Sequence, residues 1–366
     1  MPKSPNSDEL GLFYCASFVP DDSRKKVLTS PSTCSALSID VNALTFSVLR
    51  LLSHAEFRSG EEIAARLGVS RASISNALAD LAGLGVEVFK LRGQGYRLAE
   101  PLEWLDGAAL AGALGAAKTP FTLEIADVVA STNTLLLQKA ALGAPHASVL
   151  AAEYQTEGKG RRGRSWETTL GGTLTFSVLW RFNHGISQLG GLSLAVGVAL
   201  IRAMKDIGID DVAVKWPNDL IHRYRKVAGI LIELQGEALG PAAAVIGVGV
   251  NLRLSDAARQ RIDQAVTDVH GVLGSIPSRN ELLSLLLLRM SEVLRQFEEE
   301  GFASLREEWQ AAHAYQGRPV ALLLPSGVRE SGEVRGVAED GTLLVDTGAG
   351  PRRFAAGEIS LRAADA

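Results

Sequence analysis

A short glycine-rich cationic segment, residues 158–166, constrains the fold of this chain more than any other feature. It reads Gly-Lys-Gly-Arg-Arg-Gly-Arg-Ser-Trp, with four cations and three glycines. An apolar run over 148–152 leads into it, and a strand-like run over 173–182 follows. Glycine lets backbone N–H groups approach an anion closely, and Arg and Lys add charge-assisted bonds to phosphate oxygens. The pattern predicts an anion-holding loop between two strands. A solvated basic patch, or a tract that contacts RNA, stays open as the alternative.

Bulk composition narrows the class of protein. The 366 residues include Lys+Arg 37 and Asp+Glu 41, a net charge of -4, so any binding to nucleic acid needs a local basic patch. The longest apolar run, near 192–201, is much shorter than the ~18 residues of a membrane span. Cys15 and Cys34 form no C-x-x-C pair and no His/Cys cluster, so we expect neither a disulfide scaffold nor a metal site built from protein ligands. We therefore expect a cytoplasmic protein without a membrane partner.

The first segment, residues 1–41, is rich in Pro, Ser and Asp, with one apolar run over 10–19. Asp8 and Glu9 precede that run, where a secretory signal carries positive charge. We expect a disordered or misassigned extension, with a targeting peptide as the minor alternative.

Residues 42–100 have the pattern of a winged helix. Apolar spacing predicts helices over 42–52, 60–67 and 71–84. Ser59 and Glu62 form a capping box before the second helix, Gly68 stops that helix, and Ser70 caps the third. The short turn over 67–70 resembles that of a helix-turn-helix. Alternating strands over 86–91 and 96–98 would form the wing, and a linker helix is expected over 107–115.

The winged helix carries candidate DNA contacts. Its third helix can present side chains to base edges, and its wing can present cations to phosphates. The seven basic against six acidic residues of 43–100 give +1, which is low for a DNA reader, so a winged helix kept only as a packing module remains open. The candidate residues are Arg71, Ser73, Ser75 and Asn76 on the helix, and Lys90, Arg92 and Arg97 on the wing.

Two further domains are expected, in a chain of the α+β class. Residues 115–315 mix strand-like and helical runs with short connections, which predicts a central mixed domain. Its strands are expected over 121–125, 148–154, 173–182, 212–215, 228–234 and 244–251, and its helices over 132–141, 192–207 and 280–299. Residues 316–366 contain short strands over 320–324, 328–337 and 342–346, which predicts a small β-barrel of SH3-like size.

Two motifs of the central region can carry chemistry. Lys215 ends an apolar strand and opens the turn Lys-Trp-Pro-Asn-Asp; a cation on a rigid strand end can lie against charge that develops in a reaction. The alternative is an exposed strand-end lysine. Residues 131–133, Ser-Thr-Asn, start a helix and can read a polar ligand group, or they form an ordinary N-cap.

Taken together, five segments resemble the biotin–protein ligases in order and spacing: 131–133, 153–166, 215–219, 226–231 and 247–251. With a winged helix ahead and a small barrel behind, the chain resembles the bacterial bifunctional biotin ligases and biotin-operon repressors. The resemblance implies a class II synthetase-like ligase domain. It also implies that biotin and ATP, with Mg²⁺, form biotinyl-5′-AMP. The ε-amine of a lysine on biotin carboxyl carrier protein then takes the biotinyl group.

The resemblance also assigns roles to residues. Ser131, Thr132, Asn133 and Gln155 are implied to bind biotin, together with the closing loop at Lys159, Gly160 and Arg161 and with Lys215. Lys215 and Arg161 are implied to act in catalysis. Arg164, Trp166, Asn218, Lys226 and Arg362 are implied to contact the nucleotide. A homodimer formed with adenylate bound would place two recognition helices on operator DNA.

Two features depart from the family pattern. Lys159 stands where relatives often have Arg, so the loop keeps the charge but loses the planar bidentate fork. Residues 252–275 contain no Trp, Phe or Tyr, so Val266 or Val272 offers adenine only apolar contact. Two other functions stay open beside the ligase: a winged-helix regulator that senses biotin without turnover, and a lipoate-type ligase.

Overall fold

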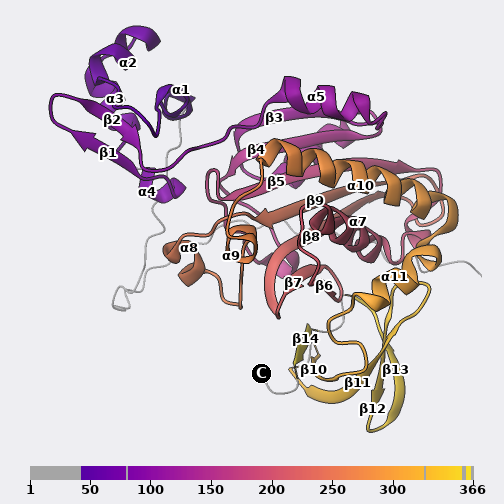
Figure 1. Ribbon diagram of the computed structural model, residues 1–366. Helices are drawn as coiled ribbons and strands as arrows, with labels where there is room; N and C mark the ends of the chain where they lie inside the picture. Colours follow the sequence, from indigo (N-terminus) through magenta and orange to yellow (C-terminus); the bar gives the residue numbers. More distant parts are fainter. Residues whose placement is uncertain (1–42, 80, 325–326, 357–359, 364–366) are drawn as a thin grey trace, which may run out of the picture. The chain divides into compact units, whose positions relative to one another are not determined.

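The computed structural model describes residues 43–79, 81–324, 327–356 and 360–363 (Figure 1). The extension predicted over 1–41 lies outside these residues. Among the described residues, no helix combines the length and the apolar character that a membrane span requires.

The first region is a winged helix. The helix ends lie where the sequence predicts them. Ser59 caps the second helix by accepting from the N–H of Glu62, and Gly68 ends that helix in the left-handed conformation. Ser70 caps the third helix. Phe46, Leu49 and Ile74 are fully buried in its core. The elements are α1 (Ala43–Leu51), α2 (Gly60–Leu67), α3 (Arg71–Ala77), α4 (Leu81–Leu84) and the hairpin of β1 (Val88–Leu91) with β2 (Gly95–Leu98).

The single helix predicted over 71–84 is wrong, because the structure has α3 and α4 there. After Ala77 the N–H of Ala79 bonds to the carbonyl of Asn76, three residues back, which tightens and ends the α-helix. The second short helix then turns Leu81 and Leu84 into the core, where both are buried.

The central domain is built on a seven-stranded mixed sheet in the order β3-β4-β5-β9-β8-β7-β6 (Figure 1). Only β3 and β4 run parallel, and every other neighbouring pair is antiparallel. Strand β7 was not predicted, since it is a four-residue strand directly after a turn. The strands are β3 (Thr122–Val129), β4 (Ser148–Gln155), β5 (Thr173–Phe182), β6 (Val212–Lys215), β7 (Asp219–His222), β8 (Arg225–Gly236) and β9 (Ala242–Asn251).

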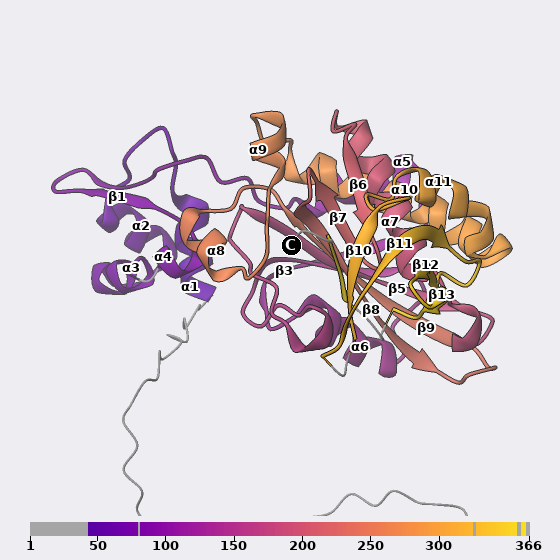
Figure 2. The ribbon, with the colours of Figure 1, turned by 90° about the horizontal axis from the view of Figure 1, so that it is seen from below.

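Helices cover both faces of this sheet (Figure 2). On one face, Ala151 and Phe176 belong to a core shared with α5 (Gly107–Ala116), α7 (Leu192–Asp206) and α10 (Arg279–Glu300). On the other, Leu150 and Leu179 pack with α6 (Thr132–Ala141). Because successive side chains of a strand point to opposite faces of the sheet, β4 and β5 contribute residues to the cores on both faces. The N-terminus of α6 is thereby held over the middle strands of the sheet.

The chain continues through short helices into an antiparallel sheet of five strands, in the order β13-β12-β11-β10-β14. The all-β character predicted for this region is confirmed, whereas β13 and β14 were not predicted. The helices are α8 (Asp256–Arg261), α9 (Val269–Leu273) and α11 (Arg306–Ala311), and the strands are β10 (Pro319–Leu323), β11 (Arg329–Val337), β12 (Leu343–Thr347), β13 (Gly350–Phe354) and β14 (Ser360–Ala363).

Candidate active site

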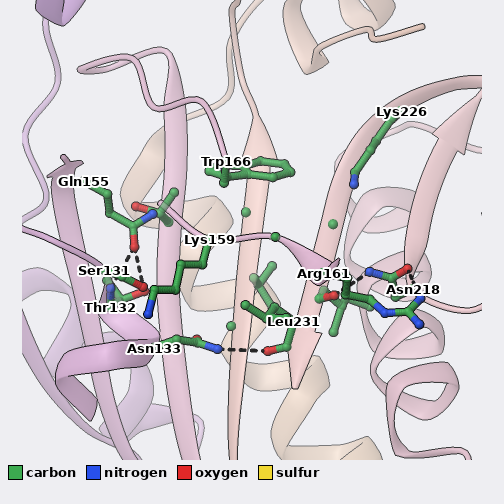
Figure 3. A pocket seen from close by; sticks show the side chains of 17 residues that line it. Ser131, Thr132, Asn133, Gln155, Lys159, Arg161, Trp166, Asn218, Lys226 and Leu231 are labelled. Carbon is green, nitrogen blue, oxygen red and sulfur yellow. Dashed lines mark hydrogen bonds between the residues drawn. The ribbon is translucent and has the colours of Figure 1, made fainter. Parts of the chain in front are cut away.

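One pocket gathers the segments that the sequence singled out (Figure 3). Strands β5, β8 and β9 form its floor, the start of α6 forms one wall, and the cationic loop lies along it. Its lining consists of Ser131, Thr132, Asn133, Gln155, Lys159, Gly160, Arg161, Trp166, Thr175, Asn218, Lys226, Gly229, Ile230, Leu231, Gly247, Val248 and Gly249.

The cationic loop joins β4 to β5, as predicted, and closes on itself like a small hairpin. The N–H of Gly160 donates to the carbonyl of Arg164 at 2.7 Å, and that of Trp166 donates to the carbonyl of Gly158 at 2.8 Å. A β-carbon on Gly158 would stand 2.4 Å from the Trp166 carbonyl oxygen, so the hairpin requires glycine there. This closure turns Lys159 and Arg161 toward the pocket.

The polar wall is a hydrogen-bonded group at the start of α6. Gln155 Oε1 accepts from the backbone N–H of Thr132 at 2.7 Å and lies 3.1 Å from the Thr132 hydroxyl (Figure 3). Ser131 caps the helix by accepting from the N–H of Thr134 at 3.5 Å. Behind the wall, the buried Ser177 of β5 places its oxygen 2.7 Å from Thr132 Oγ1.

Asn133 braces this wall against the sheet. Its side-chain Nδ2 donates to the carbonyl of Leu231 at 3.2 Å and to Glu233 Oε2 at 2.9 Å. Its Oδ1 lies 2.6 Å from the Ser177 hydroxyl. The whole amide is therefore engaged by protein groups on β5 and β8, which makes Asn133 a brace for the pocket wall.

A cation and an aromatic ring face each other at the other end of the pocket. Lys226 Nζ lies 2.7 Å from Asp219 Oδ1 and 5.4 Å from the centre of the Trp166 ring. The Lys226 and Asp219 side chains are only 14% and 16% exposed, so water screens the pair weakly. The Trp166 ring sits over Gly249, where a β-carbon would stand 2.4 Å from it. A ligand here meets an ion-paired ammonium group beside an aromatic face.

Arg161 ties the loop to other parts of the site. Its Nη1 donates to Asn218 Oδ1 at 3.1 Å, and its Nη2 donates to the backbone carbonyl of Ala356. Burial, followed by the nearby charge of Arg162, lowers the pKa of Arg161, and Asp219 opposes that shift. Asn218 is fixed in turn, because its Nδ2 donates to the carbonyl of Ile230 at 2.7 Å. The structure thus holds this guanidinium at the pocket edge.

Comparison with known proteins gives three matches to family models. Residues 125–251 match the model of the biotin/lipoate A/B protein ligase family, residues 45–97 that of an HTH domain, and residues 315–362 that of the biotin protein ligase C-terminal domain. The chain is 36% identical over 330 residues to the bifunctional ligase/repressor BirA of Escherichia coli strain K12, covering 88% of this chain and 99% of that relative. The chain belongs to the biotin–protein ligase family.

Other family members agree with this assignment. The biotin–[acetyl-CoA-carboxylase] ligase of Mycobacterium tuberculosis is 32% identical over 241 residues, covering 64% of this chain and 87% of the relative. The solved structure of the biotin protein ligase from Aquifex aeolicus in complex with biotin and ATP has a TM-score of 0.57 and 28% identity, covering 66% of this chain and 99% of the other. The resemblance predicted from the five motifs is confirmed.

The two lysines near the turn at 216–218 differ in their relation to this pocket. Lys215, at the end of β6, is not among the described residues that line the pocket, whereas Lys226 is. Lys215 pairs in register with Asp219, and Asp219 carries the ion pair to Lys226. Arg164 lines an adjoining hollow with Glu233. The side chain of Arg362 lies outside the described part of the chain.

The candidate DNA contacts fall into two groups. The first group is accessible at the surface. Arg71 forms a highly exposed ion pair with Glu61 at 3.1 Å, Asn76 and Arg92 are exposed, and Ser75 is partly exposed. Others have structural contacts of their own. The Ser73 hydroxyl lies 2.8 Å from that of Ser70, and Lys90 lies 5.5 Å from the Tyr96 ring. The Arg97 guanidinium lies 5.1 Å and 5.2 Å from the centres of the Phe57 and Phe89 rings, and it donates to the carbonyl of His54.

Several residues of this site escaped prediction from the sequence. Ser177 and Glu233 sit in ordinary strand patterns, and only the sheet pairing brings them to Asn133. The glycines of 247–251 were recognised as a motif, but their function of leaving room for the Asn133 and Trp166 side chains was not. A strand glycine paired with polar residues across a sheet is the signal that could have located this floor.

Proposed function

We propose that this protein joins biotin to ATP and then transfers the biotinyl group to a lysine of a carrier protein. A carboxylate oxygen of biotin attacks the α-phosphorus of ATP, and the bond to pyrophosphate breaks. The lysine amine then attacks the acyl carbon, AMP leaves and the amine loses a proton. The observation that carries the proposal is one pocket with a polar wall at Thr132 and Gln155 and cations from Lys159, Arg161 and Lys226.

The two ends of the pocket suit the two ends of the substrate. The wall at Thr132 and Gln155 can bind the polar ring system of biotin. At the other end, Lys226 beside Trp166 can neutralise the carboxylate and the α-phosphate as they meet, in a setting that is poorly screened by water. We assign this neutralising role to Lys226 rather than to Lys215, because only Lys226 lines the pocket.

The nucleotide would bind as its magnesium complex. Among the residues that the structure describes, no group of three or more His, Cys, Asp or Glu could hold a metal ion. Mg²⁺ would therefore arrive on the ATP phosphates. The aromatic face for the nucleotide would come from Trp166, since residues 252–275 provide none.

The loop can protect the intermediate. An acyl-adenylate reacts readily with water, and it needs a cover between the two steps. Lys159 and Arg161 lie on a hairpin that already bonds to Asn218, so a small closing movement would enclose a bound adenylate.

The test is release of pyrophosphate from biotin and MgATP, followed by mass spectrometry of an added carboxyl carrier domain. We expect biotin-dependent release and a single biotinyl addition on one carrier lysine. No release with biotin contradicts the proposal. Release with lipoate in place of biotin would instead indicate a lipoate-type ligase, and tight biotin binding without turnover a sensor.

A second function is supported by the winged helix. We propose that the protein also represses transcription by binding operator DNA as a dimer when the adenylate is bound. The match to an HTH domain, and the name ligase/repressor of a relative that this chain covers almost completely, support it. Ultracentrifugation with and without biotinyl-5′-AMP, followed by DNA titration, tests it. A monomer that binds no DNA with adenylate bound contradicts it.

A further inference from the structure

The direction of the hydrogen bonds behind the pocket wall is fixed by chemistry. Asn133 Nδ2 lies against two acceptors, the Leu231 carbonyl at 3.2 Å and the Glu233 carboxylate at 2.9 Å. Neither can donate, so the amide of Asn133 must turn its nitrogen toward them. Its oxygen then faces Ser177, at 2.6 Å. Because an amide oxygen only accepts, Ser177 must give its single proton to Asn133.

The direction of the Ser177 hydrogen bond determines that of Thr132. Ser177 Oγ lies 2.7 Å from Thr132 Oγ1, a contact that needs a proton between the two oxygens. Since the Ser177 proton is used on Asn133, the Thr132 proton must fill this contact, and it is not available to Gln155 Oε1 at 3.1 Å. A hydroxyl has one proton and two lone pairs. Thr132 therefore presents lone pairs to the pocket.

Gln155 offers the pocket a hydrogen-bond donor, where Thr132 offers an acceptor. Its Oε1 is occupied by the backbone N–H of Thr132 at 2.7 Å, so its Nε2 turns away from Thr132. That nitrogen lies beside the cationic loop, 3.3 Å from where a β-carbon of Gly158 would stand. The wall therefore combines an acceptor at Thr132 with a donor at Gln155. A ligand group that complements it has an N–H donor beside a carbonyl acceptor, which is the arrangement in a cyclic urea.

We propose that Ser177 and Glu233, neither of which lines the pocket, are positioning residues that make this wall specific for a urea N–H. The inference rests on the proposed function, because it assumes that biotin enters here with its ureido ring against Thr132. A ligand without N–H groups, such as the dithiolane of lipoate, would leave the Thr132 lone pairs without a partner. An unmatched buried polar group discriminates strongly between ligands.

Burial protects this relay, the chain of hydrogen bonds from Asn133 through Ser177 to Thr132. Ser177 is 0% exposed, and Thr132 and Asn133 are 4% and 3% exposed. Water therefore has no access to replace a missing hydroxyl. Without the Ser177 oxygen, Thr132 can turn its proton toward the ligand, and the wall loses its fixed polarity.

The experiment compares biotin with biotin methylated on each ureido nitrogen in turn. Dissociation constants from calorimetry, and KM and kcat for adenylation, are measured for the wild type, Ser177→Ala and Glu233→Gln. The matched control is Thr173→Val, which removes another buried hydroxyl of β5, bonded to Thr169 at 3.1 Å and outside the pocket lining.

We expect one of the methylated compounds to bind the wild type about 100-fold more weakly than biotin. In Ser177→Ala, biotin itself should bind about 10-fold more weakly, and the discrimination should fall by a similar factor. KM for ATP and kcat at saturating biotin should stay within about 2-fold, because the relay is remote from the phosphates. The control should keep the wild-type discrimination.

Glu233→Gln provides a second test if Ser177→Ala fails to fold, since glutamine can donate and lets the Asn133 amide turn over. Unchanged discrimination in the variant that folds overturns the proposal. A wild type that binds and adenylates biotin but shows no preference for it over both methylated compounds also overturns it. A wild type that neither binds nor adenylates biotin would instead refute the proposed function.

Discussion

The Asn133 side chain fills the space that a side chain at Gly247 would occupy: a β-carbon at position 247 would stand 2.1 Å from Asn133 Oδ1. Gly247 lies on β9, between β5 and β8. It pairs in register with Ser177 on β5 and with Leu231 on β8. Those two residues are also hydrogen-bond partners of Asn133. The missing side chain thus lets the amide lie directly on the sheet between its partners.

Gly247→Ala should displace Asn133 and with it the polar wall. We expect KM for biotin to rise at least about 10-fold and stability to fall by about 1–3 kcal/mol, since the methyl group overfills a packed site. Adenylation kinetics and urea unfolding measure the two effects. The control is Gly112→Ala in α5, where a β-carbon meets nothing within 4 Å, and it should stabilise the protein by about 0.5–1 kcal/mol. Equal kinetics for the two variants would contradict this account.

Lys226 and Lys215 should differ sharply when they are replaced. Lys226→Ala removes a poorly screened cation from the pocket, and we expect adenylate formation to slow by about 100-fold. Lys215→Ala changes a residue outside the lining, and we expect a much smaller loss. Single-turnover measurement of pyrophosphate release separates the two. A larger loss in Lys215→Ala would return the neutralising role to Lys215.

Arg161→Gly should release the loop from Asn218 and from the carbonyl of Ala356. We expect the adenylate to escape before transfer, so that lysines of an unrelated protein such as albumin become biotinylated. Arg162→Gly is the comparison, since the Arg162 side chain is exposed and its φ of 58° already suits glycine. Mass spectrometry of the albumin measures the leak. Equal labelling by both variants would show that the contacts of Arg161 do not retain the intermediate.

Local patterns predicted much of this protein, because caps, turns and apolar spacing are local properties. Ser59, Gly68 and Ser70 were enough to place α2 and the start of α3. The pocket floor was not predictable in this way, since Gly247 meets Asn133 only through the order of the sheet. The sequence alone also gives no way to compare Lys215 with Lys226: both are lysines near one turn, and only the fold puts Lys226 in the pocket lining.

His313 gives the protein a buried base with an acid-sensitive effect on stability. It is 5% exposed and stacks on Trp309 at 4.5 Å, and among the described residues neither ring nitrogen has a hydrogen-bond partner. Burial lowers the pKa of His313 from 6.5 to about 3. Its neighbours Ala312 and Ala314 bond to both sides of Val214 on β6, so the histidine lies on a segment that is held to the edge of the sheet.

The sign of the pH effect follows from this pKa. Below pH 6.5 the unfolded chain binds a proton at His313 that the folded chain excludes until about pH 3, so acid favours unfolding. The contribution of His313 is fully retained above pH 6.5, and we expect a loss of about 2 kcal/mol by pH 5. His313→Phe keeps a ring on Trp309 but cannot titrate. Urea unfolding at pH 7 and at pH 5 should therefore show a smaller acid loss in this variant, by about that amount. His54→Gln, at an exposed histidine, should follow the wild type. Parallel losses in the wild type and His313→Phe would mean that the buried ring does not set the acid response.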